Sequence, residues 1–218
     1  MEGIVKVAGI PSWIPLILIG CLLLMAAAKL VDGKRFDEFL LLPVTNKYFM
    51  VHGKSVELFV PFNLFLLMAQ LFSVSLFVFY LIVNFSDKYT FQDTVLFIQV
   101  FSFYTLFVAV KFYIEKIIGE LFSIESNMND YLYVKLSHKN WLSLPILGIN
   151  FLVFYTFKTG VVFAVVCVAI IILLNAFLLI YFIKSNQKYI AGNLFYFILY
   201  LCALEILPYY LLYKWIVG

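Results

Sequence analysis

Charged side chains are scarce in this sequence: Asp, Glu, Lys and Arg make up 12% of 218 residues. A typical soluble domain carries about 25%. Hydrophobic residues account for 65% and aromatic residues for 20%, which is more apolar side chain than one soluble domain can bury under a polar surface. This composition excludes a soluble enzyme, a disordered tail and a disulfide-rich secreted module. It predicts an integral membrane protein.

Histidine and cysteine are also rare. The two histidines, His52 and His138, lie far apart in polar segments, and the three cysteines lie inside apolar runs without metal-ligand or redox spacing. The net charge of +3 comes with no basic run that would follow a phosphate backbone. We therefore expect no metal, no cofactor and no nucleic-acid partner.

Phosphate-binding loops, nucleophile elbows and HExxH motifs are absent too, which argues against an enzyme.

Long apolar runs are what the sequence does contain. A membrane-spanning helix needs about 20 apolar residues, and six runs meet this requirement. The predicted fold is all-α: a polytopic membrane helix bundle forming a single transmembrane domain over 1–218, with spans at 12–30, 56–85, 93–113, 141–157, 160–184 and 191–216. Two further segments are amphipathic: an interfacial segment at 34–53, and a cytoplasmic helix extension at 111–136 with a turn at 126–130.

The distribution of basic residues between the spans predicts the orientation. Six spans place both termini on one side of the membrane, and that side carries only Lys6, Lys88, Lys158 and Lys214. The other 11 of the 15 basic residues fall on the opposite side. Since cytoplasmic loops carry the excess of Lys and Arg, we predict that both termini are periplasmic.

Polar residues inside the predicted spans are the default functional candidates, because they are costly in lipid. Helix depth places Gln70, Gln99 and Glu205 in one layer of the outer half, and Asn63 and Asn175 in a second layer of the inner half. Roughly 20 Å of depth separates Glu205 from Lys111, which excludes an ion pair between them. These groups either join helices or, at Glu205, form a protonatable site. Arg35, Lys111 and Lys116 are candidate interfacial contacts.

The closing residues Tyr200–Pro208, with sequence YLCALEILP, resemble the signature of domain-of-unknown-function family 4271 of Bacteroidota membrane proteins. Looser similarity covers Arg35-Phe36 through Tyr48-Phe49, Lys116, Gly119, Leu121-Phe122, Tyr131 and Leu144-Pro145, so that the resemblance extends over most of 30–216. It implies an inner-membrane location and makes Glu205 and Pro208 part of a family motif. It implies no activity.

Three functions remain open from the sequence. The first is a non-enzymatic inner-membrane scaffold or assembly subunit of a cell-envelope complex, with another membrane protein or a second copy as partner. A secretion or gliding role would follow from taxonomy alone. The second is a small transporter or channel that uses the polar layer around Glu205. The third is an interfacial lipid-modifying enzyme with a groove joining 34–53 to 111–140.

Overall fold

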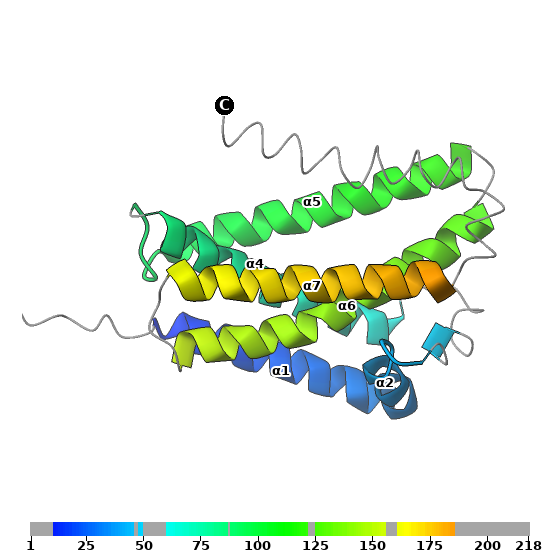
Figure 1. Ribbon diagram of the computed structural model, residues 1–218, viewed down its shortest axis with the longest axis horizontal. Coiled ribbons are helices and arrows are strands. Elements are labelled where there is room, and N and C mark those ends of the chain that lie inside the picture. Colours follow the sequence, from blue (N-terminus) through cyan, green and yellow to red (C-terminus); the bar gives the residue numbers. More distant parts are fainter. Residues whose placement is uncertain are drawn as a thin grey trace, which may run out of the picture.

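The computed structural model describes residues 11–45, 48–49, 60–86, 88–121, 125–155 and 161–185, and the regular structure of these residues is helical. Five long helices lie side by side as a bundle, with one short helix at the end of the first (Figure 1). The helices are α1 (Trp13–Val31), α2 (Gly33–Leu40), α4 (Pro61–Phe85), α5 (Thr94–Leu121), α6 (Glu125–Tyr155) and α7 (Val161–Ser185).

Three of the described helices, α1, α4 and α5, are long and apolar enough to cross a membrane, judged by length and composition. The apolar stretch of α7 over Val162–Phe177 is shorter, and α6 begins with a polar half. The all-helical, membrane-compatible fold is thus confirmed. The number of six spans stays a prediction, and the last of them, 191–216, lies outside the described residues.

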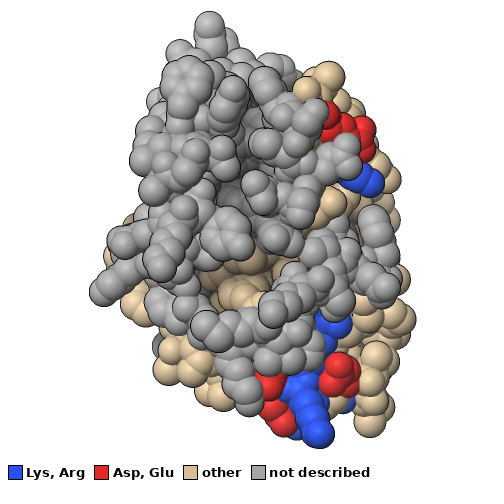
Figure 2. Space-filling view, turned by 90° about the vertical axis from the view of Figure 1, so that its right-hand side faces the viewer, with Lys and Arg blue, Asp and Glu red and all other residues tan. Residues whose placement is uncertain are grey.

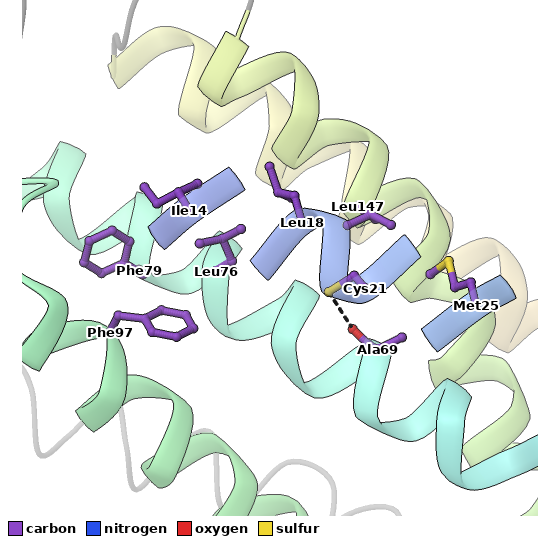
Figure 3. Packing of buried hydrophobic residues seen from close by; sticks show 9 residues of the cluster. All are labelled: Ile14, Leu18, Cys21, Met25, Ala69, Leu76, Phe79, Phe97 and Leu147. Carbon is purple, nitrogen blue, oxygen red and sulfur yellow. Dashed lines mark hydrogen bonds between the residues drawn. The ribbon is translucent and has the colours of Figure 1, made fainter. Parts of the chain in front are cut away.

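The central helix is α4, which contacts α1, α5, α6 and α7. Its side chains interlock with a stripe on α1 spaced three or four residues apart, as expected for one helix face. The small Ala69 lets α1 approach closely, and the Cys21 thiol donates a hydrogen bond to its carbonyl oxygen at 3.8 Å (Figure 3). The cluster drawn there comprises Ile14, Leu18, Cys21, Met25, Ala69, Leu76, Phe79, Phe97 and Leu147.

The predicted interfacial segment begins as helix α2. Asp32 caps this helix by accepting a hydrogen bond from the Arg35 backbone N–H at 3.0 Å. Phe39 is fully buried, and the Trp141 indole of α6 donates to the Leu40 carbonyl oxygen at 3.1 Å. The start of segment 34–53 is therefore packed against the end of the bundle. Charged side chains of both signs appear at the surface of this end (Figure 2).

The structure corrects the prediction over 111–136. We expected one helix extension that turns at 126–130, but α5 ends at Leu121 and residues 126–130 belong to the first turns of α6. The helix begins with Glu125, and an acidic residue in the first turn is favourable because it interacts with the positive end of the helix dipole. The residues from 125 to 136 are thus the first third of α6, and α6 continues through Pro145.

Candidate functional site

A buried guanidinium joins three helices at the end of the bundle that carries α2. Arg35 is 8% exposed, and its Nη2 donates to Asn63 Oδ1 of α4 at 3.4 Å and to the Tyr133 hydroxyl of α6 at 3.0 Å. The guanidinium also lies 4.9 Å from the centre of the Phe62 ring, within the range of a cation–π contact. Arg35, predicted as an interfacial contact, therefore lies inside the bundle.

Aromatic rings enclose this guanidinium. Tyr48 and Tyr133 stack with ring centres 6.0 Å apart, and Phe39 meets Phe62 edge-on. Burial raises the pKa of Tyr133, an effect that the neighbouring Arg35 opposes. Tyr133 is therefore protonated at neutral pH and serves as a neutral hydrogen-bonding group.

His138 lies one turn beyond this layer on α6. Its ring stacks on Phe49 at 5.4 Å, and burial lowers its pKa below the usual 6.5. The neutral ring must carry its proton on Nδ1, because Nδ1 lies 2.8 Å from the Val134 carbonyl oxygen, which can only accept. Although His138 lies in a polar segment of the sequence, it is thus helical and partly buried.

An ion pair connects α5 to α6. Lys135 Nζ lies 2.7 Å from Glu115 Oε1, and these side chains are 12% and 3% exposed. Lys111, one turn before Glu115, is also buried, whereas Lys116 is exposed. Of the two lysines predicted as interfacial contacts, only Lys116 therefore faces outward.

Within the span of α4, the polar groups face other helices. Gln70 is buried and donates from Nε2 to the Tyr104 hydroxyl of α5 at 3.1 Å. One turn further on, the Ser73 carbonyl oxygen accepts from Asn150 Nδ2 of α6 at 2.9 Å. These bonds tie the central helix to α5 and α6 within the apolar length of α4.

In each of the two predicted polar layers, the structure gives one residue a partner that the sequence had not indicated. In the outer predicted layer, Gln70 bonds to Tyr104, Gln99 is exposed on α5, and Glu205 lies outside the described residues. In the inner predicted layer, Asn63 bonds to Arg35 and Asn175 is exposed on α7. Whether either layer forms as predicted stays open.

Sequence reasoning missed Tyr133, Ser73, Ser143 and Tyr104. Serine and tyrosine are common in apolar helices, so their presence alone gives no signal. Their spacing along one face of a helix does: Tyr133, Asn140, Ser143 and Asn150 recur at three- and seven-residue intervals on α6. A search for aligned hydroxyls and amides on α6 would have found Tyr133 and Ser143, whereas Ser73 and Tyr104 lie on α4 and α5.

The described residues include no group of three His, Cys, Asp or Glu side chains placed to hold a metal ion. Their two cysteines, Cys21 and Cys167, are buried and free. The described polar groups form bonds between helices. Arg35, the Glu115–Lys135 ion pair and several side-chain amides hold α2, α4, α5 and α6 together.

Comparison with known families supports the family resemblance predicted from the sequence. Residues 14–216 match the family described as "Domain of unknown function (DUF4271)". The chain belongs to this family. The match spans all six described helices as well as the YLCALEILP segment, which lies outside the described residues. No curated protein and no solved structure matches the chain.

Proposed function

We propose that this chain is a multi-pass protein of the bacterial inner membrane that acts as a non-enzymatic scaffold or assembly subunit of a cell-envelope complex. The supporting observation is an amide on the outward face of α5. Gln99 is exposed next to Val95 and Ile98, with Phe103 following one turn later. An amide facing lipid finds no hydrogen-bond partner there. A helix of another protein, or of a second copy, would supply one.

The outward face of α7 repeats this pattern. Asn175 is exposed among apolar side chains that are also exposed, including Ile172, Leu173 and Phe177. Lipid alone would satisfy the apolar side chains but not the amides. Two outward helices that each carry an amide therefore favour a protein partner. The sequence offers Glu205 as an alternative partner for Gln99 and Asn63 for Asn175, and the experiment below distinguishes the two partners of Gln99.

The buried polar groups support a structural role for the interior of the bundle. Arg35, the Glu115–Lys135 pair and Gln70 each bond one helix to another. Such bonds fix the relative positions of helices, which is what a rigid platform for a partner requires.

The arrangement of basic residues supports the proposed orientation. α1 and α5 end, and α6 begins, at the same end of the bundle (Figure 1). Lys29, Lys34, Arg35 and Lys116 are at that end, together with the first turns of α6, whereas Lys88 follows α4 at the opposite end. The excess of positive charge supports a cytoplasmic location for the α2 end, and with six spans both termini would then be periplasmic. Membership of the family adds the inner membrane of Bacteroidota as the expected location.

Photo-crosslinking in native membranes tests the assembly role. Phe103, one turn from Gln99 and 56% exposed, is replaced by p-benzoylphenylalanine, which keeps an aromatic side chain at that position. We expect illumination to give one discrete protein adduct, with the mass of a second copy or of one other polypeptide. The Gln99→Leu variant should lose most of this adduct.

The control places the same probe at Leu23, which is 64% exposed on the outward face of α1. We expect no discrete adduct from that position, because the α1 face offers lipid only an apolar surface there. If Phe103 gives no more adduct than Leu23, the partner does not lie on α5 and the proposal fails. If Gln99→Leu instead leaves the adduct intact, Gln99 is satisfied within its own chain, as by Glu205.

A further inference from the structure

A line of polar side chains runs along the contact between α4 and α6. Asn150 Nδ2 donates to the Ser73 carbonyl oxygen at 2.9 Å, and Ser73 Oγ donates to the Ser143 carbonyl oxygen at 3.4 Å. Ser143 Oγ in turn donates to the Asn140 carbonyl oxygen at 2.6 Å. These side chains are each at most 2% exposed, as is that of Gln70, which lies one turn before Ser73 on α4 and bonds to Tyr104 of α5. We call this set, Gln70, Ser73, Asn140, Ser143 and Asn150, the polar seam.

Three amide oxygens of the polar seam find no hydrogen-bond partner among the residues that the structure describes: Gln70 Oε1, Asn140 Oδ1 and Asn150 Oδ1. Turning the Asn150 amide over would not help, because its oxygen would then face the Ser73 carbonyl oxygen, which can only accept. Turning the Gln70 amide over would let its oxygen accept from Tyr104 but would leave its N–H groups without that partner. The imbalance therefore does not depend on how either amide is oriented.

Buried amide oxygens in membrane helices need a donor, since hydrocarbon supplies none. A cation is a poor candidate, because none of the five seam residues carries a negative charge and a cation among them would lack compensation in a low-dielectric interior. Water is neutral, donates two hydrogen bonds and commonly fills buried polar sites. The chemistry of the seam thus matches water.

We propose that the polar seam is a binding site for ordered water molecules, which donate hydrogen bonds to Asn150 Oδ1, Gln70 Oε1 and Asn140 Oδ1. Beyond Asn150, the helices meet in an apolar cluster that includes Phe77, Val153 and Ala164, so the bound water lies between that cluster and the Arg35 end of the bundle. This site is independent of the assembly role, because it faces the interior of one chain. It gives α4 and α6 a hydrated contact instead of a dry one.

Solid-state NMR of the full chain in phospholipid bilayers tests this site directly. The experiment measures how fast magnetisation passes from water protons to the side-chain carbonyl carbons of Asn150 and Gln70. The matched references are the backbone carbonyl carbons of Ala69 and Leu76, which lie on the same helix as Gln70 and are fully buried in the apolar cluster with α1. We expect transfer to the two amide carbons to be several-fold faster than transfer to the references.

Equal rates at the amide carbons and at the references would overturn the proposal.

Discussion

The replacement of Lys135 by methionine tests how strongly the polar groups hold the bundle together. Methionine keeps most of the length of the lysine stem but removes the charge that lies 2.7 Å from Glu115. Glu115 is 3% exposed, so its carboxylate cannot turn to water without moving α5. Breaking a buried ion pair by removing one partner typically costs about 3–5 kcal/mol, because the remaining charge is left uncompensated. We expect Lys135→Met to lower the free energy of unfolding by about this amount.

A double-mutant cycle separates the lost pair from lost packing. Glu115→Leu combined with Lys135→Met removes both charges and should restore most of the stability, since an apolar pair of similar volume often replaces a buried ion pair at little cost. The free energy of unfolding is measured for the wild type, both single variants and the double variant by titration with sodium dodecyl sulfate in mixed micelles. Lys116→Met, at an exposed lysine on α5, is the matched control and should change stability by about 0.5 kcal/mol or less.

Two outcomes would refute this reasoning. If Lys135→Met were as mild as Lys116→Met, the ion pair would contribute nothing beyond a surface contact. If the double variant were less stable than the sum of the single variants predicts, removal of both charges would not relieve the cost, and the packing of the stems would be the dominant contribution.

Three further predictions concern the α2 end and the orientation of the bundle. Because the pKa of His138 is lowered in the folded protein, the unfolded chain binds a proton more readily, so stability should fall as the pH drops below about 6.5. His138→Phe should flatten this pH dependence in unfolding titrations at several pH values. An unchanged slope would show that other groups cause the pH dependence. Trp141→Phe removes the hydrogen bond to the Leu40 carbonyl oxygen and should lower the free energy of unfolding by about 0.5–1.5 kcal/mol, measured in the same titration. An unchanged free energy of unfolding would show that water replaces the indole N–H as donor to that oxygen. With native cysteines removed, Lys88→Cys should react with a membrane-impermeant maleimide in intact cells and Lys116→Cys only after permeabilisation, and the reverse pattern would invert the proposed orientation.

The apolar helices were the most predictable part of the fold. The predicted first span at 12–30 and fifth span at 160–184 correspond to α1 and α7 within one residue at each end. Their boundaries are clear because polar or turn-forming residues interrupt continuous apolar runs there. Pattern alone was less informative between 111 and 136, because an amphipathic helix with polar residues in its middle is hard to distinguish from two helices that meet at a turn. The start of α6 at Glu125, ahead of the polar run 126–130, decided the question.

The polar contacts were only partly predictable, for a geometric reason. Depth along a helix follows from residue number, so the sequence identified Gln70 and Asn63 as groups inside the membrane. The direction in which each side chain points depends on helix rotation and on which helices are neighbours, and a single sequence does not fix either. Gln70 thus meets Tyr104 of α5, and Asn63 meets Arg35, which had been expected at the interface. Gln99 faces outward on the same helix as Tyr104.

The proposed assembly would be joined through the outward face of α5. The mass of the particle released from native membranes into lipid nanodiscs, measured by native mass spectrometry, tests it most directly. We predict a defined complex for the wild type, containing a second copy or one stoichiometric partner, and a single chain for Gln99→Leu extracted in the same way. A single chain for the wild type, with folded protein and normal expression, would contradict the claim.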